Sequence, residues 1–342
     1  MTSSILITGG AGYIGSHTAV ELMNAGHFVV IVDNLCNSSI HVLNRLRTLC
    51  GERFAFVQGD ARDAAALDRI FDAHNIDGVI HFAGLKAVGE SVTQPVRYFD
   101  NNVGSTLALL QAMDRSGVRR IVFSSSATVY GDPERVPITE DSRLQVTNPY
   151  GRTKLMCEDI LRDQQASDPR WQVAILRYFN PVGAHESGLI GEHPSGVPNN
   201  LMPYITQVAV GKRTHLSIFG NDYPTPDGTG VRDYIHVVDL AQGHLAALNH
   251  LKTQQTSITL NLGTGRGVSV KQLADTFAQV TGVPVPCQYA SRRAGDVASL
   301  CADTRLAEQT MGWKAQLGLE RMCADAWRWQ SANPDGYQGS AP

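Results

Sequence analysis

The stretch Ile5-Leu6-Ile7-Thr8-Gly9-Gly10-Ala11-Gly12-Tyr13-Ile14-Gly15 decides the fold, because it joins a short apolar run to glycines spaced as GxxGxxG. The run predicts a buried strand, and the residues after it predict a helix to about Gly26. Gly9 permits a tight turn, Gly12 lets the backbone approach a bound group, and Gly15 lets helix and strand pack closely. Without the flanking strand and helix, the glycines would indicate only a turn. In this context they predict a loop that holds a phosphate group at a helix N-terminus.

The first half of the chain repeats this alternation of apolar runs and helical patterns. Runs that are apolar throughout are typical of parallel strands buried on both faces, and the segments between them are long enough for crossover helices. The sequence therefore predicts an α/β fold with a doubly wound, Rossmann-type parallel sheet. The runs are residues 5–8, 28–32, 54–57, 78–82, 121–124 and 173–176.

The composition changes after Asn180. Residues 181–203 and 220–230 are rich in Gly, Pro and Asn, which predicts loops that carry binding function. Regular patterns return in three segments, residues 233–250, 269–281 and 319–330. We therefore expect an NAD-type Rossmann domain over residues 1–180. A smaller mixed α/β substrate-binding domain over residues 181–342 should follow, with some segments packing back on the first.

Composition excludes several classes of protein. The net charge of −3 over 342 residues forms no basic stripe, so we expect no nucleic-acid partner. No run of about 18 apolar residues is present, and the strand at Ile5 leaves no room for a secretory signal, so we expect no membrane partner. The 6 cysteines contain no CxxC pair, which fits a reducing compartment. The expected location is the cytoplasm.

Asp33 is expected to end the second strand, 18 residues after Gly15. An acidic side chain there accepts from both ribose hydroxyls of a dinucleotide and repels a 2′-phosphate, which favours NAD over NADP. Taken without the glycines, Asp33 would equally be a turn or helix-capping residue. Asp60, after the third strand, has the same two interpretations.

Tyr150 and Lys154 begin a predicted helix after Asn148-Pro149, and their spacing places them on one face, a turn apart. Lowering the tyrosine pKa from about 10 to ~7 needs roughly 4 kcal/mol. We expect a nearby ammonium and a positive nicotinamide to supply it. Tyr150 would then be a general base for a substrate hydroxyl. YxxxK alone is common on helix surfaces, so its weight depends on its surroundings.

A polar stretch, residues 124–128, follows the fifth strand at the carboxyl edge where ligands bind in parallel sheets. A hydroxyl there completes a Ser, Tyr, Lys proton relay. For Ser124 and Ser125 taken separately, a polar strand end or a helix cap is the alternative.

Longer strings carry a resemblance to a known family. They are His81–Ser91, Ser124–Gly131, Arg177–Ala184, Asn199–Pro203 and Gly230–His236. Together they resemble the UDP-glucose 4-epimerase family of extended short-chain dehydrogenases, from Ile5 to about Trp329. These strings are far more specific than GxxGxxG.

The resemblance implies a role for each residue of the site. Tyr150 is the implied base, Lys154 its electrostatic partner and a ligand of the nicotinamide ribose, and Ser126 a hydrogen-bond partner of the sugar O4. The implied NAD contacts are Gly9, Gly12, Tyr13, Ile14, Gly15, Asp33, Asn34, Asn37, Asp60, Ala61, Phe82, Ala83, Gly84, Lys86, Asn101, Ser124, Tyr150, Lys154 and Phe179. The implied UDP-sugar contacts are Ser126, Tyr150, Asn180, Asn200, Leu201, Phe219, Arg232, Arg293, Asp296 and Leu300. Arg232 and Arg293 also suit a diphosphate by charge.

The implied activity is the interconversion of UDP-galactose and UDP-glucose through a transient 4-keto sugar, with hydride transfer to and from bound NAD. Leu300 departs from the family pattern, in which Tyr limits the enzyme to glucose and galactose while Cys or Ser admits N-acetylated sugars. Epimerase activity on UDP-N-acetylglucosamine, in addition or instead, is therefore the alternative. The helical stretches 96–116 and 149–165 could pair across a homodimer.

Rival functions make different demands on the sequence. In the nucleotide-sugar 4,6-dehydratase family, the stretch after the fifth strand resembles Thr-Asp-Glu, and its carboxylates serve as acid and base for dehydration. The corresponding stretch here, Ser126-Ala127-Thr128, has no carboxylate. A non-catalytic NAD sensor should have lost Tyr150 or Lys154. We assign no metal, because His185-Glu186 and Glu192-His193 are expected to be solvated loop residues without fixed ligand spacing.

Overall fold

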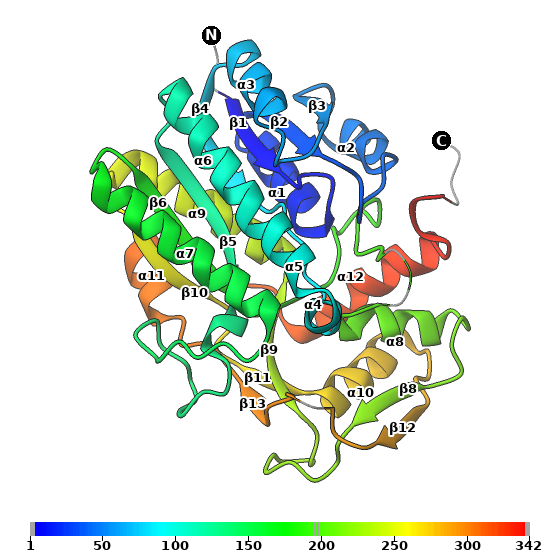
Figure 1. Cartoon of the computed structure of the whole chain (residues 1–342). Helices are drawn as coiled ribbons and strands as arrows, with labels where there is room; N and C mark the ends of the chain where they lie inside the picture. The colour runs from blue at the N-terminus through cyan, green and yellow to red at the C-terminus, as the bar shows by residue number, and fades with distance from the viewer. Residues whose placement is uncertain (1–3, 195, 197, 294, 339–342) are drawn as a thin grey trace.

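A seven-stranded sheet organises the larger part of the molecule (Figure 1). The computed structural model describes residues 4–194, 196, 198–293 and 295–338. All neighbouring strands of this sheet are parallel. Their order is β10 (Ile258–Leu262), β6 (Gln172–Tyr178), β5 (Arg120–Ser126), β4 (Ile76–His81), β1 (Ser4–Thr8), β2 (Phe28–Asp33) and β3 (Phe54–Gln58). The predicted doubly wound parallel sheet is confirmed.

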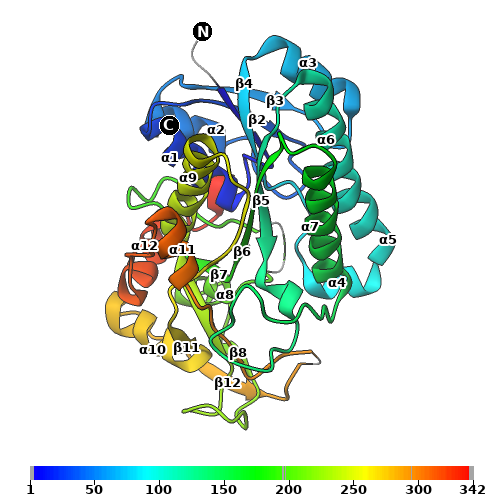
Figure 2. The same cartoon turned by 90° about the vertical axis from the view of Figure 1, so that its left-hand side faces the viewer.

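Helices cover both faces of this sheet, as Figure 2 shows. One layer contains α1 (Tyr13–Asn24), α2 (Val42–Cys50) and α9 (Val237–Gln254). The other contains α3 (Ala64–Ala73), α6 (Gly104–Ser116) and α7 (Pro149–Ser167). Within the part of the chain that the structure describes, no helix combines the length and apolar character needed to cross a membrane.

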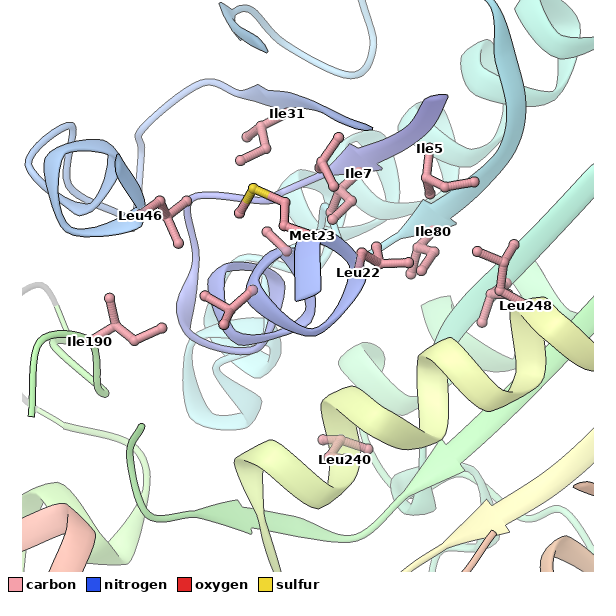
Figure 3. Packing of buried hydrophobic residues seen from close by; sticks show 14 of the residues in the cluster. Ile5, Ile7, Leu22, Met23, Ile31, Leu46, Ile80, Ile190, Leu240 and Leu248 are labelled. Atoms are coloured by element: carbon pink, nitrogen blue, oxygen red, sulfur yellow. The ribbon is translucent and has the colours of Figure 1, made fainter. Parts of the chain in front are cut away.

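Strand β1 shows why the predicted strands are apolar throughout. Ile5 and Ile7 point into the core beneath α1 and α9, where Leu22 and Leu248 lie around them (Figure 3). Leu6 points the other way, into the core beneath α3, α6 and α7. Successive side chains of a strand alternate between faces, so a sheet covered on both sides leaves no position for a polar stripe.

A second group of elements lies beyond the carboxyl edge of the large sheet (Figure 1). One small sheet has the order β11 (Gly267–Ser269), β9 (Val231–His236) and β13 (Ser299–Leu300), with β7 (Asn180–Val182) also pairing with β9. A second pairs β12 (Cys287–Ala290) with β8 (Leu216–Phe219). Helices α8 (Leu201–Ala209), α10 (Val270–Thr281) and α12 (Leu319–Ala332) pack with them around one core. Strand β10 and helix α9 join the large sheet instead, while the proposed boundary after residue 180 remains a prediction.

The helical stretch predicted over residues 96–116 is interrupted by a π-helical segment. It consists of α5 (Pro95–Tyr98), η1 (Phe99–Val103) and α6. In η1 the buried Asn102 accepts from the Leu85 backbone N–H at 2.7 Å and donates to Thr153 Oγ1 at 2.9 Å. Such local widening commonly serves a functional site. The shorter remaining elements are α4 (Val88–Thr93), α11 (Arg305–Met311), η2 (Ala127–Tyr130) and η3 (Gly336–Gln338).

Candidate active site

The glycine loop forms the floor of a first cavity at the carboxyl edge of the large sheet. Gly9 has a φ of +71°, a conformation that favours glycine. A Cβ atom on Gly15 would lie 2.4 Å from the Gly9 carbonyl oxygen, so a side chain there would push loop and helix apart. Helix α1 begins immediately after Gly12 and turns its N-terminal N–H groups toward this loop. The residues present therefore fit the pyrophosphate of a dinucleotide.

Asp33 connects the end of β2 to the glycine loop. Its Oδ2 accepts from the Ala11 backbone N–H at 3.0 Å, and its Oδ1 accepts from Leu35 N–H and Ser38 Oγ, both at 2.9 Å. Asp33 therefore stabilises a turn, which was the structural interpretation of this residue. It also lines the first cavity, which its interpretation as a ribose-binding residue required. The chemistry of this carboxylate fits a ribose diol.

Asp60 lies beside Asp33 at the same cavity. Asn34 Nδ2 donates to Asp60 Oδ2 at 3.1 Å, and the Arg62 guanidinium donates to both carboxylate oxygens. The hydrogen bonds from Arg62 lower the pKa of Asp60 to about 2. The carboxylate therefore stays ionised and fixed at the far end of the cavity.

The first cavity brings together most of the predicted cofactor residues. Those that line it are Gly9, Gly12, Tyr13, Ile14, Gly15, Asp33, Asn34, Asn37, Asp60, Ala61, Phe82, Ala83, Gly84, Lys86, Asn101, Tyr150 and Lys154. The predicted residues Ser124 and Phe179 are not among the described residues that line it: Phe179 packs against Ala127 and Tyr130. Sequence reasoning missed Tyr178 and Tyr337, which do line it. Tyr178 lies inside a quoted string, whereas Tyr337 lies beyond the span of the resemblance and carried no signal.

Tyr150 and Lys154 occupy the first two turns of α7. Asn148 caps the helix by accepting from Gly151 N–H at 2.9 Å, and Pro149 occupies the first turn, where it suits a helix. Both side chains are buried and both line the first cavity. Lys154 Nζ donates to the Ser124 carbonyl oxygen at 2.8 Å, which fixes the ammonium at the end of β5.

Burial dominates the electrostatics of this pair. It raises the pKa of the Tyr150 phenol, Tyr178 raises it further, and a hydrogen bond with Ser126 lowers it. Burial also lowers the pKa of Lys154 to about 8. The expected lowering of the Tyr150 pKa is therefore not supplied by the protein alone, because the desolvation of a buried phenolate outweighs the hydrogen bond with Ser126.

Ser126 ends β5 and begins η2. Its Oγ accepts from Thr128 N–H at 3.2 Å and from Thr128 Oγ1 at 3.0 Å, so it caps the short helix. The remaining capacity of this hydroxyl is available to Tyr150. The neighbouring Ser125 turns away and donates to Glu158 Oε1 at 2.5 Å.

A second cavity lies among β7, α8, β8 and β9, on the smaller group of elements. The predicted substrate residues that line it are Asn180, Asn200, Leu201, Phe219, Arg232, Arg293 and Asp296. The Arg293 guanidinium lies 4.7 Å from the Phe219 ring centre and donates to Asp296 Oδ2 at 2.9 Å. Arg232 Nη1 donates to the carbonyl oxygens of Val231 and Val297 at 2.8 and 2.9 Å.

Sequence reasoning missed other residues of the second cavity. Tyr204, Tyr223 and Tyr234 line it. Tyr234 could have been found, because it lies two residues after Arg232 on β9 and strand alternation places both on one face. Of the predicted substrate residues, Ser126, Tyr150 and Leu300 are not among those described at this cavity. Tyr150 lines the first.

Leu300 lies on β13, paired with Arg232 of β9. Its half-buried side chain packs on a core cluster that includes Ala127 and Phe179. The same cluster supports η2, next to Ser126. Leu300 is therefore linked to both parts of the site, through Ala127 next to Ser126 and through Arg232 of the second cavity, without being among the described lining residues of either cavity.

The expectation that Glu192 is a solvated loop residue was wrong. Its side chain is only 9% exposed, and its Oε1 accepts from Lys86 Nζ at 3.2 Å and from Asn200 Nδ2 at 2.6 Å. The loop packs directly on α12: a Cβ atom on Gly191 would lie 2.3 Å from the ring of Trp329, which is on that helix. Composition indicated a loop but could not show that its carboxylate points inward.

The fold and this site define a class of protein: a dinucleotide-dependent enzyme of the short-chain dehydrogenase type, with a second cavity beside its Tyr and Lys pair. A sequence model of the family described as GDP-mannose 4,6 dehydratase matches residues 6–326. The UDP-glucose 4-epimerase of Bacillus subtilis is 58% identical, covering 98% of this chain and 99% of that protein. The chain belongs to the UDP-glucose 4-epimerase family, which confirms the resemblance.

Solved structures give the same result. UDP-glucose 4-epimerase from Stenotrophomonas maltophila, with bound NAD and formylated UDP-arabinopyranose, has a TM-score of 0.95 and 53% identity, over 97% of this chain and 99% of that one. The enzyme from Bifidobacterium longum, in complex with NAD+ and UDP, has a TM-score of 0.94 and 51% identity, over 98% of this chain and 100% of that one.

Proposed function

We propose that the protein is an NAD-dependent isomerase that interconverts UDP-galactose and UDP-glucose. The observation that carries this proposal is the position of Tyr150 and Lys154 of α7 in the lining of the first cavity, where Lys154 is bound to β5 and Tyr150 to Ser126 at the end of that strand. NAD held by the glycine loop, Asp33 and Lys154 would supply a hydride acceptor for C4 of the sugar and a hydride donor for the resulting ketone. Family membership supports this substrate and cofactor.

In this proposal Tyr150 moves the proton of the sugar 4-hydroxyl. Ser126 hydrogen-bonds both the phenol and the sugar O4, and Lys154 stabilises the phenolate through its charge. Because burial raises the pKa of Tyr150, the base needs a further positive charge nearby, and the oxidised nicotinamide fits that need. Arg232 and Arg293 neutralise the diphosphate. Anchoring through UDP leaves the hexose with few fixed contacts, so the ketone can turn between its two faces.

The test is to incubate the purified protein with UDP-galactose, with no added NAD, and to separate the products by anion-exchange chromatography. We expect UDP-glucose, formed with cofactor that the protein retains. A protein that stays inactive after NAD is added contradicts the proposal. UDP-N-acetylglucosamine is run in parallel, because activity on it alone would favour the alternative substrate.

We further propose that the protein is a homodimer. Figures 1 and 2 show α6 and α7 side by side on the outer face of the sheet. Apolar side chains on and beside these helices are open to solvent: Val92 is 61% exposed, Val96 78%, Leu107 42% and Met156 40%. A second copy of the chain would cover them. Light scattering at micromolar concentration tests this: we expect a dimer that Val96→Glu weakens and Val280→Glu, on α10, does not. A wild-type monomer contradicts it.

We also place the protein in the cytoplasm. All 6 cysteines are free thiols in the structure, as a reducing compartment favours. Labelling thiols in freshly lysed cells tests this location, because oxidised cysteines would contradict it.

A further inference from the structure

Glu192 lines the first cavity and binds one residue from each of the two cavities. Its Oε1 accepts from Lys86 Nζ at 3.2 Å and from Asn200 Nδ2 at 2.6 Å. Lys86 lines the first cavity, and Asn200 lines the second. The two donors come from different parts of the fold, the loop after β4 and the residue before α8. One carboxylate oxygen therefore joins the cofactor cavity to the nucleotide cavity.

Hydrogen bonds from α12 and from the segment after it hold the backbone that carries this carboxylate. Trp329 Nε1 donates to the Glu192 carbonyl oxygen at 3.3 Å. The buried Tyr337 hydroxyl accepts from Gly191 N–H at 3.2 Å and donates to the Gly191 carbonyl oxygen at 3.0 Å. The backbone of Glu192 is thus held by α12 and by the segment after it. The backbone that carries the carboxylate is therefore held without any contribution from Lys86 or Asn200.

The energetics favour a role in positioning over a role in folding. Lys86 is 42% exposed, so its ion pair with Glu192 is screened by water and contributes little to stability. The Asn200 amide forms no capping bond to its own helix, α8, so Glu192 rather than the helix sets its direction. Because both donors share one oxygen, a ligand that fixes one of them changes how firmly the other is held.

We propose that Glu192 is a positioning residue that couples the two cavities, holding Lys86 toward the cofactor and Asn200 toward the nucleotide. The inference rests on the proposed function, because it takes NAD and UDP as the two ligands. A nucleotide that fixes Asn200 also fixes Glu192 and, through it, Lys86. Bound UDP therefore strengthens the retention of NAD, and the coupling is reciprocal.

The experiment measures the release of NAD from the holoenzyme, with and without saturating UDP, together with the Kd of UDP from calorimetry. In the wild type we expect UDP to slow NAD release by a factor of about 5 or more. Glu192→Ala should bring this factor close to 1, and Lys86→Met should do the same. The double variant should show the same factor as either single variant, because both changes break the same connection between the two cavities.

Two further variants separate positioning from a general loss of structure. Glu192→Gln keeps an acceptor for Asn200 without the charge that holds Lys86, so we expect an intermediate factor. Glu186→Ala removes an exposed carboxylate of the same loop region and should retain the wild-type factor. A wild-type factor in Glu192→Ala, or no effect of UDP in the wild type, overturns the coupling while UDP binding still supports the proposed function. A wild type that does not bind UDP overturns both.

Discussion

Lys154 donates a hydrogen bond of 2.8 Å from its Nζ to the carbonyl oxygen of Ser124. This contact joins helix α7 to the end of β5, two residues before Ser126. The Phe123 ring lies below the ammonium, 4.9 Å from Nζ to the ring centre, and excludes water from that side. The positive charge that the proposed chemistry needs is therefore held at a fixed point in a site with little water. The same burial lowers the pKa of Lys154 to about 8.

Removal of the proposed base tests the assignment of Tyr150. Tyr150→Phe keeps the ring but removes the hydroxyl proposed to take the proton, so we expect kcat to fall by about 10²–10⁴. The Kd of UDP should not change, because Tyr150 lines the other cavity. Tyr204→Phe, in the second cavity, is the control and should keep most of the activity. A Tyr150→Phe variant within tenfold of wild type would show that another group moves the proton.

The depressed pKa of Lys154 predicts a pH-dependent stability. Its pKa is about 8 in the folded protein and about 10.5 when unfolded, so the unfolded chain binds more protons between these values and stability rises with pH across that window. Below pH 8 the buried charge costs about 3 kcal/mol, a net figure that already includes the bond to Ser124. Lys154→Met should therefore be inactive but about 3 kcal/mol more stable at pH 7.

Urea unfolding of Lys154→Met and wild type at pH 7 and at pH 10.5 measures this difference. We expect the advantage of the variant to shrink toward zero at the higher pH. An advantage that stays constant across the window would mean that the charge of Lys154 is not its source. Lys271→Met, at an exposed lysine, is the control.

Leu300 should set the limit on sugar size. Its side chain packs against the cluster under Ser126, and Cys at this position frees space without disturbing the β13 pairing. We expect wild-type turnover of UDP-galactose and little of UDP-N-acetylglucosamine. Leu300→Cys should raise the second several-fold relative to the first. Equal turnover of the acetylated sugar by wild type and variant would place the size limit elsewhere.

The ion pair between Arg177 and Glu158 should be required for folding. Arg177 Nη2 lies 2.6 Å from Glu158 Oε2, and both side chains are fully enclosed, at 2% and 0% exposure. Arg177→Met leaves the buried Glu158 carboxylate paired with the partly exposed Arg162 and with Ser125, which should cost about 3 kcal/mol of unfolding free energy. Arg177→Met combined with Glu158→Leu should recover much of that loss.

Urea unfolding measures these changes, with Arg170→Met as the matched control. Arg170 pairs with Asp168 at 2.8 Å, but it is 74% exposed, so its loss should change the unfolding free energy far less than the loss of Arg177. Similar costs for Arg170→Met and Arg177→Met would contradict the role assigned to burial.

Local patterns in the sequence were enough to predict the large sheet and most of the glycine-loop side of the first cavity. The GxxGxxG loop, Asp33 and the Tyr150–Lys154 pair each depend on backbone geometry within a few residues, and regular elements fix that geometry. The small sheets were harder to predict. Strand β13 has only 2 residues, and a periodic pattern needs more than that to be visible.

The sequence by itself determined the class of fold, the glycine loop and the pairing of Tyr150 with Lys154 at one cavity, because spacing along a strand or helix dictates which side chains share a face. Only the tertiary structure decided that Glu192 turns inward to join Lys86 and Asn200. Only burial in the folded chain decided that the pKa of Tyr150 rises. Both depend on groups distant in sequence, whose effect on desolvation and contact exists only once the chain has folded.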